Sequence, residues 1–286
     1  MQNQQIFQDQ TEIARLAVQN QLLSAYEAAA VEQIFAAGSR WAVLDIGCND
    51  GLKTVHRFSN PAITHVVGLE YNQDLAEDAQ SRYGNEKVSF HACDVESAGF
   101  SEQLREICCR REIEGFDVIY LSFVLMHLRQ PEQLLQRLKP FLKDSGCLLI
   151  IEPNDRASRL EPDPEGLLTA FLDILEQDKY AGNRRTGAEL IPMLHSAGYR
   201  DEKIWQEAIG AEAGEREKKQ DIFQTFFSYL PEDVMLLRQQ EPDDGRYLAW
   251  EQWLRQNFEN LRQAVTQDAA RIQMGVRMIS CRKGEA

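Results

Sequence analysis

The sequence predicts an α/β protein built on a doubly wound, mostly parallel sheet of seven strands. Short apolar runs bounded by turn residues recur through the middle of the chain, as buried parallel strands require. Segments with helical periodicity separate these runs, and that alternation favours parallel strands with helices on both faces of the sheet. The chain also carries a helical segment before the sheet and a helical insert before the last strand.

The expected elements follow from these two patterns. Strands are predicted at 41–46, 64–70, 87–94, 116–124, 146–153, 199–206 and 272–283. Helices are predicted at 72–83, 101–112, 131–143, 166–179 and 186–197. The stretch 153–166 is rich in proline and charge and is expected to be irregular. In a parallel sheet of this kind, ligands bind beyond the carboxyl ends of the strands.

The regions outside the sheet are expected to be helical. Residues 6–37 place apolar side chains close to a period of 3.6, and Gly38 is a natural stop. Two amphipathic segments, 218–230 and 246–265, form the insert. They either pack against the sheet domain or cover the ligand site, where their aromatic side chains also line a pocket or a dimer contact. The expected division is a helical lid at 1–38, a sheet domain at 39–206 plus 271–286, and a cap at 207–270.

The overall charge disfavours nucleic acid as a partner. The net charge is −14, and an acidic surface repels phosphate backbones. A neutral or cationic small molecule, or a basic peptide, is a better match.

The cysteines and the hydropathy pattern indicate a cytoplasmic protein. The six cysteines form no C-x-x-C pair and lie near no histidine cluster, so neither a bound metal nor a disulfide framework is expected. Reduced thiols indicate a reducing compartment. No secretory signal is visible, and no apolar run reaches the roughly 20 residues that span a bilayer.

Polar side chains stand where the predicted strands end. Five strand ends carry such groups, four of them acidic: Asp45, Glu70, Asp94, Ser122 and Glu152. Because the carboxyl ends of parallel strands meet at one edge of a sheet, we expect these groups to surround a ligand there.

The first of these ends reads V-L-D-I-G-C-N-D-G (43–51). It resembles the first motif of class I S-adenosylmethionine-dependent methyltransferases, G-x-G-x-G, with Asn49 in place of the middle glycine. Asparagine tolerates a positive φ better than other non-glycine residues, so the tight turn is expected to survive. Its side chain changes how closely the backbone approaches a ligand.

The resemblance implies a seven-stranded, Rossmann-like fold that binds S-adenosylmethionine and releases S-adenosylhomocysteine. It implies that Glu70 holds the ribose hydroxyls, although Glu70 could instead cap the next helix, and that Asp94 and the Val95 N–H meet the adenine. The expected cofactor residues are Asp45, Gly47, Cys48, Asn49, Gly51, Glu70, Tyr71, Asp94, Val95 and Ser122. The resemblance covers 41–153 well and 186–206 loosely, whereas 207–270 matches nothing in the family.

A dinucleotide is the alternative ligand for such a turn. The glycine spacing differs from G-x-G-x-x-G, and no basic residue of the turn meets a phosphate. Lys53, the nearest cation, is expected to belong to the following helix rather than to the turn.

The sequence contains fewer signals for the methyl acceptor than for the methyl donor. The expected catalytic residues are His127 and Glu152. The alternative role for His127 is packing at the start of a helix, and the alternative for Glu152 is hydrogen bonding to backbone at the end of its strand. The expected substrate residues are Tyr26, His127, Asn154 and Tyr180, with Asp155 nearby; the tyrosines otherwise serve packing.

The end of the fourth strand, LSFV, lacks the Asn/Asp-Pro-Pro-aromatic form of enzymes that methylate nucleic-acid bases. No Pro-Cys pair or paired-glutamate loop indicates cytosine C5 or protein arginine as the acceptor. We therefore expect a methyltransferase acting on an O or N atom of a small molecule, with a homodimer as one arrangement. The alternatives are a protein or peptide methyltransferase, and a non-catalytic protein that binds the donor or dimerises.

Overall fold

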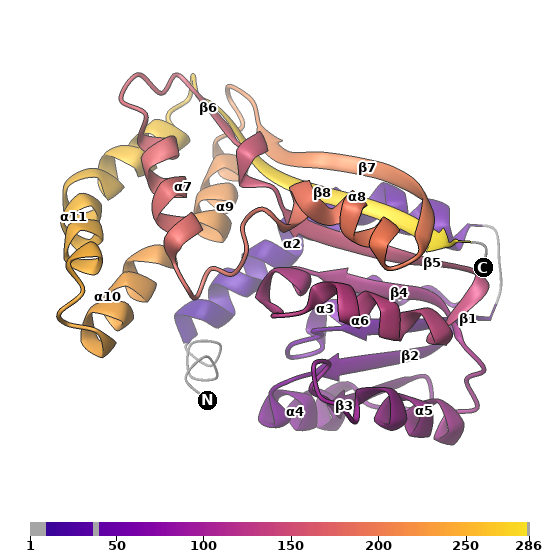
Figure 1. The fold of residues 1–286 in the computed structure, drawn as a ribbon. Coiled ribbons are helices and arrows are strands. Elements are labelled where there is room, and N and C mark those ends of the chain that lie inside the picture. Colours follow the sequence, from indigo (N-terminus) through magenta and orange to yellow (C-terminus); the bar gives the residue numbers. More distant parts are fainter. Residues whose placement is uncertain (1–9, 37–39, 285–286) are drawn as a thin grey trace. The chain divides into compact units, whose positions relative to one another are not determined.

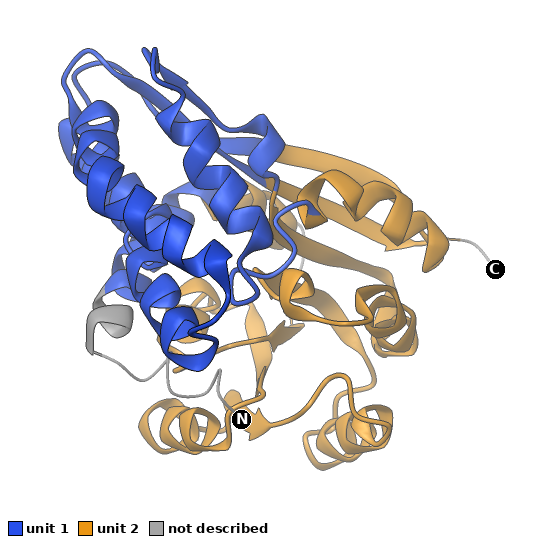
Figure 2. Cartoon of the chain, turned by 60° about the vertical axis from the view of Figure 1, so that its left-hand side comes forward, with its two compact units in different colours: residues 1–26, 154–185, 207–276 blue, residues 27–153, 186–206, 277–286 orange. Residues whose placement is uncertain are grey.

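The computed structural model describes residues 10–36 and 40–284, with side chains from Arg15 onward (Figure 1). The predicted helix residues 6–9 and 37, and the stop at Gly38, lie outside the described residues. The chain forms two compact units (Figure 2). Unit 1 is Met1–Tyr26, Asn154–Arg185 and Glu207–Val276, and unit 2 is Glu27–Pro153, Thr186–Gln206 and Arg277–Ala286. The predicted functional division into lid, sheet domain and cap stays a prediction.

Unit 2 contains five parallel strands, in the order β3-β2-β1-β4-β5. These are β1 (Trp41–Ile46), β2 (Ile63–Glu70), β3 (Val88–Ala92), β4 (Phe116–Ser122) and β5 (Leu142–Pro153). At the carboxyl end of β1, Ile46 pairs with Leu69 of β2 and with Leu121 of β4. The doubly wound order therefore brings the ends of β1, β2 and β4 together at one edge.

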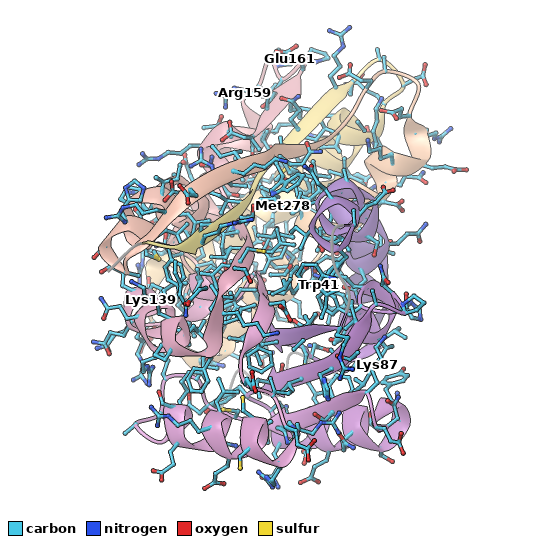
Figure 3. The ribbon with its side chains drawn as sticks, turned by 90° about the vertical axis from the view of Figure 1, so that its right-hand side faces the viewer. Trp41, Lys87, Lys139, Arg159, Glu161 and Met278 are labelled. Atoms are coloured by element: carbon cyan, nitrogen blue, oxygen red, sulfur yellow. The ribbon has the colours of Figure 1, made fainter. Side chains whose placement is uncertain are left out.

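The sheet continues with β8 (Arg271–Lys283) and β6 (Arg159–Glu161), which pair antiparallel, while β7 (Tyr199–Ala211) also pairs with β8. The seven predicted strands are all present. β6 makes an eighth and falls in the stretch predicted to be irregular. It is only three residues long, with Arg159 and Glu161 exposed on either side of buried Leu160, so it has little periodicity to detect (Figure 3).

The helices of unit 2 have local reasons to start where they do. Asn72 caps α4 (Gln73–Tyr83), since its side chain accepts hydrogen bonds from the N–H groups of Asp74 and Leu75. Proline occupies the first position of α6 (Pro131–Leu138). The other helices of this unit are α3 (Leu52–Arg57), α5 (Phe100–Arg110), α8 (Thr186–Ser196) and the short 3₁₀ turns η1 (Leu125–His127) and η2 (Lys139–Phe141).

Alternate side chains of the strands build the core of unit 2. Leu44, Ile46, Ile119, Leu121 and Ile150 are at most 1% exposed and belong to one apolar cluster with helix side chains. Since both faces of these strands are buried, the strands appear in the sequence as continuous apolar runs.

Unit 1 has a helical core of its own. It contains η3 (Asp155–Ala157), α7 (Leu167–Gln177), α9 (Arg216–Phe226), α10 (Leu230–Gln240), α11 (Gly245–Thr266) and the part of α2 (Gln10–Phe35) that ends at Tyr26. Phe223 stacks on Phe227 at 5.1 Å between ring centroids, and Phe227 lies 4.7 Å from Phe171 of α7. The insert aromatics thus pack with α7 in this unit. The sequence predicted two insert helices, and α10 is a third.

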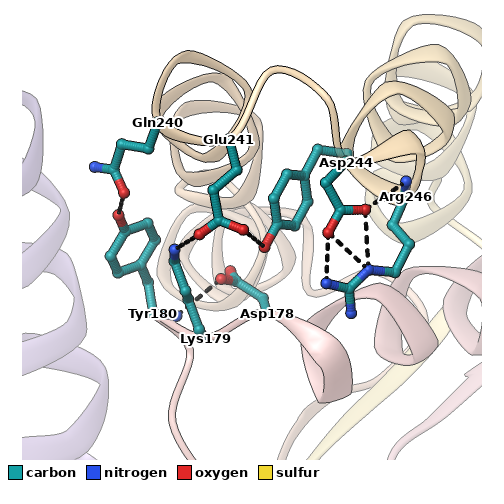
Figure 4. Close-up of polar contacts among 8 residues, drawn as sticks. Asp178, Lys179, Tyr180, Gln240, Glu241, Asp244 and Arg246 are labelled. Carbon is teal, nitrogen blue, oxygen red and sulfur yellow. Dashed lines mark hydrogen bonds and ion pairs between the residues drawn. The ribbon is translucent and has the colours of Figure 1, made fainter.

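Two polar features stabilise the ends of the insert helices. Lys219 is fully buried, and its ammonium donates to the carbonyls of Gln267 and Asp268, just past the end of α11. A cation at that position is favoured by the helix dipole. Between α7 and α10, Lys179 pairs with Glu241, and Tyr180 bonds Gln240 (Figure 4).

A buried ion cluster joins three elements of unit 2. Glu27, 1% exposed and on the second half of α2, pairs with the guanidinium of Arg57 on α3. It also accepts a hydrogen bond from the Tyr120 hydroxyl of β4 at 2.8 Å. Lys53 lies 3.7 Å from the same carboxylate. These contacts fix α2 and α3 relative to the centre of the sheet.

We predict that Glu27→Ala destabilises the protein by about 3–5 kcal/mol, because it leaves a buried guanidinium without its partner. Glu32→Ala, on an exposed site of the same helix, is the matched control and should change stability by less than about 0.5 kcal/mol. Urea denaturation measures both. Equal effects of the two substitutions would contradict a structural role for the cluster.

Candidate functional site

The turn after β1 uses left-handed backbone at three alternate positions. Gly47, Asn49 and Gly51 have φ values of 73°, 51° and 76°. A Cβ on Gly47 would lie 2.7 Å from the side chain of Val124, and one on Gly51 would lie 2.7 Å from the ring of Phe90. The glycines are therefore required both by the turn and by close packing inside the protein. Asn49 adopts the positive φ expected of it.

Glu70 ends β2 and holds this turn. One carboxylate oxygen accepts from the Asn49 N–H at 2.9 Å, and the other accepts from the Asn72 N–H at 3.0 Å. A carboxylate has about four lone-pair sites, so these two bonds leave capacity for ligand hydroxyls. Burial raises the pKa of Glu70. The cap of α4 is Asn72 itself, so Glu70 is not needed for that role.

Tyr71 follows Glu70 and is 62% exposed. An aromatic side chain can bury 150–250 Å² of surface, and most of that area of Tyr71 is open to solvent. Its exposed ring provides a face on which a flat heterocycle can stack, next to a carboxylate that can accept from hydroxyls.

The loop after β3 is fixed by contacts distant in the sequence. Asp94 is exposed, and its carboxylate accepts from the Glu96 N–H at 2.9 Å, which shapes the loop. Arg137 of α6 donates to the Val95 carbonyl at 2.7 Å and to the Ser97 carbonyl at 2.8 Å. Asp94 and Val95 stay predicted cofactor residues, and Arg137 was not among the predicted site residues. No local signal marks an arginine about 40 residues away as the support of this loop.

Glu152, at the end of β5, is fully buried. Its carboxylate accepts from the backbone N–H groups of Val124, Leu125 and Met126 at 3.0, 2.7 and 3.3 Å. It therefore holds the start of η1, the turn that ends at exposed His127. This geometry favours the backbone-bonding alternative for Glu152 over direct catalysis.

Asp45 lies inside the sheet, one residue before the end of β1, and accepts from the Thr54 hydroxyl at 2.6 Å. Burial raises the pKa of Asp45 to about 6, and the Thr54 hydrogen bond opposes this rise. Cys48 is also buried, and burial raises the pKa of its thiol, so Cys48 has no nucleophilic thiolate near neutral pH.

Lys53 belongs to α3, as expected, but its Nζ lies at the end of β4. It donates to the Ser122 hydroxyl at 2.9 Å and lies 5.3 Å from the centre of the Tyr120 ring. Burial and, to a smaller extent, the nearby Arg57 lower the pKa of Lys53 to about 8, although the Glu27 and Asp45 carboxylates oppose this shift. Lys53 was not among the predicted site residues.

The remaining substrate candidates lie in unit 1. Asn154 is buried, and its N–H donates to the Gly275 carbonyl at 2.8 Å. Asp155 makes a two-point ion pair with Arg184 at 2.8 and 2.9 Å. Tyr180 donates its hydroxyl to Gln240, as Figure 4 shows.

Tyr26 also belongs to unit 1. Its hydroxyl donates to the Val276 carbonyl. The structure therefore brings the cofactor candidates together in unit 2, at one edge of the sheet, while Asn154, Tyr180 and Tyr26 engage partners within unit 1.

Neither a membrane span nor a metal centre is found in residues 10–36 and 40–284. No helix there is both long and apolar enough to cross a bilayer. No group of three or more histidine, cysteine or acidic side chains there is arranged to hold a metal ion.

Residues 44–148 match the family model of a methyltransferase domain. No curated protein is significantly similar in sequence. The matched region begins in β1 and ends in β5, so it contains the glycine turn and the polar ends of β1 to β4.

Solved structures of low sequence identity share the fold. The YcgJ protein of Bacillus subtilis has a TM-score of 0.52 at 15% identity, over 91% of this chain and 98% of that one. Human N-acetylserotonin methyltransferase in complex with S-adenosylmethionine has a TM-score of 0.50 at 15% identity, over 98% of this chain and 58% of that one. Phosphoethanolamine N-methyltransferase 2 of Haemonchus contortus, bound to phosphomonomethylethanolamine and S-adenosylhomocysteine, has a TM-score of 0.50 at 14% identity, over 91% and 53%.

The raised pKa of Asp45 predicts a pH dependence of stability. Because the folded-state pKa lies above the unfolded value of 3.8, the carboxyl's stabilising contribution is fully present below about pH 4 and is lost as pH rises through about 6. Asp45→Asn removes this titration and keeps an acceptor for Thr54.

Relative to wild type, Asp45→Asn should therefore gain up to about 3 kcal/mol of unfolding free energy between pH 4 and pH 7. Urea denaturation across that range gives the difference, in which all other titrating groups cancel. A difference that does not change with pH would show that Asp45 has an ordinary pKa in the folded protein.

Proposed function

We propose that this class I S-adenosylmethionine-dependent methyltransferase transfers the donor methyl group to an O or N atom of a small molecule. Its cofactor is S-adenosylmethionine, and the product of that cofactor is S-adenosylhomocysteine. The observation that carries the site assignment is Glu70: its carboxylate is fixed by two backbone N–H groups, between the Gly47–Gly51 turn and the exposed ring of Tyr71.

The proposed donor site follows the strand ends of unit 2. Glu70 accepts hydrogen bonds from the two ribose hydroxyls, and the ring of Tyr71 stacks on the adenine. Asp94 and the Val95 N–H bind the adenine edge, on a loop that Arg137 keeps in place. The turn at Gly47, Cys48, Asn49 and Gly51 passes along the methionine end of the donor, beside Ser122.

The chemistry requires little from the protein beyond alignment. The methyl carbon is already activated by the sulfonium, so positioning the acceptor in line with the C–S bond supplies much of the acceleration, up to about 7–11 kcal/mol in favourable cases. A base is needed only when the acceptor carries a proton as it attacks. We assign that role to His127 and give Glu152 a positioning role, since Glu152 holds the turn on which His127 lies.

Three of the acceptor-side candidates lie in unit 1. Tyr26, Asn154 and Tyr180 belong to one compact unit together with the insert, and we propose these three residues as acceptor-side candidates. The structural neighbours include an N-acetylserotonin methyltransferase and a phosphoethanolamine N-methyltransferase, both named for small acceptors. A basic protein or peptide is the second candidate acceptor, favoured by the net charge of −14.

We further propose a cytoplasmic location. All six cysteines are free thiols, and four of them are buried, which agrees with a reducing compartment. A homodimer stays a prediction.

Glu70→Ala should weaken S-adenosylhomocysteine binding by about 1–3 kcal/mol, because the ribose loses its hydrogen-bond acceptor. Isothermal titration calorimetry measures the affinity. Glu77→Ala, an exposed glutamate on α4, is the matched control and should bind like wild type. Glu70 also holds Asn49 and Asn72, so the thermal midpoint of each variant is recorded. Unchanged affinity in a folded Glu70→Ala protein would remove the ribose assignment.

Transfer of a radiolabelled methyl group identifies the acceptor class. The proposal expects label in the metabolite fraction of an extract and little in the protein fraction. His127→Ala should lower turnover at least tenfold while leaving S-adenosylhomocysteine affinity within twofold of wild type. Label confined to protein would establish the second candidate, and full activity of His127→Ala would return His127 to a packing role.

A further inference from the structure

Lys53 is a cation in the proposed site that the donor-binding scheme does not use. Its Nζ bonds the Ser122 hydroxyl at the end of β4, and Ser122 follows Leu121, the partner of Ile46 at the end of β1. Gly47 comes directly after Ile46. The ammonium is thus fixed beside the start of the turn that is proposed to carry the methionine end of the donor.

Burial and the neighbouring Arg57 disfavour the ammonium form of Lys53, while the Glu27 and Asp45 carboxylates favour it. Four charged or titratable groups face it: Glu27 from α2, Asp45 from β1, Arg57 from its own helix and Tyr120 from β4. Glu27 lies 3.7 Å from Nζ, beyond hydrogen-bond distance, and its oxygens are already bonded to Arg57 and Tyr120. The side chain of Lys53 is only 16% exposed, so water solvates its charge poorly.

A second cation arrives when the donor binds. The sulfonium of S-adenosylmethionine carries a positive charge, whereas the sulfur of S-adenosylhomocysteine carries none. Two cations in one half-buried site repel each other. A lysine can respond by losing its proton, because burial and a neighbouring cation both favour the neutral amine.

We propose, building on the function proposed above, that Lys53 stores the proton that methyl transfer releases. It is a neutral amine while the sulfonium donor occupies the site and an ammonium once the uncharged product has formed. The acceptor lone pair forms a bond to the methyl carbon, and the electrons of the broken C–S bond return to sulfur. The acceptor proton, taken first by His127, comes to rest on the lone pair of Lys53.

This assignment keeps the charge of the site constant. Before transfer the site holds a sulfonium and a neutral amine, and afterwards it holds a thioether and an ammonium. The buried groups around Lys53, including the Glu27–Arg57 pair, therefore need no rearrangement. The lowered pKa of Lys53, about 8, places its titration close to neutral pH, where exchange of one proton costs little. The protonation of Lys53 before and after methyl transfer is an equilibrium property, so no contact between His127 and Lys53 is required.

Proton counting during ligand binding tests the inference without an acceptor. Isothermal titration calorimetry at pH 7.5, in phosphate and in Tris, gives the protons released when S-adenosylmethionine or S-adenosylhomocysteine binds. The donor's own amino group also ionises, so each ligand is compared between wild type and Lys53→Met. Lys218→Met, at an exposed lysine of α9, is the control and should match wild type.

For S-adenosylmethionine, wild type should release roughly half a proton or more beyond Lys53→Met. Between pH 7 and pH 9, the affinity of wild type for S-adenosylmethionine should also rise about fivefold more than the affinity of Lys53→Met does. For S-adenosylhomocysteine the two proteins should release equal numbers of protons. Lys53→Arg keeps a permanent charge, so it should lower the ratio of donor to product affinity at least tenfold.

Equal proton release by wild type and Lys53→Met with S-adenosylmethionine would overturn the inference. The inference would also be overturned if Lys53 caused the same proton release with S-adenosylhomocysteine as with S-adenosylmethionine. If Lys53→Met does not fold, an unchanged affinity ratio in Lys53→Arg overturns it instead. Failure of wild type to bind either ligand would remove the proposed function itself, which is a different result from binding without Lys53-linked protons.

Discussion

The hydrogen bond from a loop N–H to a carboxylate is the interaction on which the whole candidate site depends. Glu70 holds the turn after β1 and the start of α4, and Glu152 holds the turn after β4. Glu96 similarly accepts from the N–H groups of Arg129 and Gln130 at the start of α6. Charged acceptors make such bonds stronger than neutral ones, so loops without regular structure keep a defined shape.

These carboxylates also explain the electrostatics of the site. Bringing acidic groups into the edge of a buried sheet removes their water, which raises the pKa values of Asp45 and Glu70. The backbone N–H groups and the Thr54 hydroxyl offset part of that cost. The result is an acidic edge that can receive a cationic ligand while the protein stays folded. The Lys53 ammonium, which bonds the Ser122 hydroxyl at this edge, repels such a ligand.

The sequence was sufficient for features with a local cause. Both faces of β1 to β5 are buried, so apolar runs revealed these strands, and the positive φ of Asn49 follows from the motif itself. It was insufficient where the cause lies far along the chain. The Glu27–Tyr120 bond spans 93 residues and the Arg137 support of Val95 spans 42. Lys53 looked like an ordinary helix residue, because nothing nearby in the sequence shows that its ammonium meets the end of β4.

Each of the two units is assembled from three separate segments, so the polypeptide passes from one to the other five times. The passages fall within α2, at the end of β5, before α8, and inside β7 and β8. Three of the five therefore interrupt a continuous helix or strand. Neither unit can be produced as one uninterrupted fragment, and removing the whole of one unit requires three separate deletions. Gene fusion or domain shuffling could acquire or discard the helical portion only by rebuilding these shared elements.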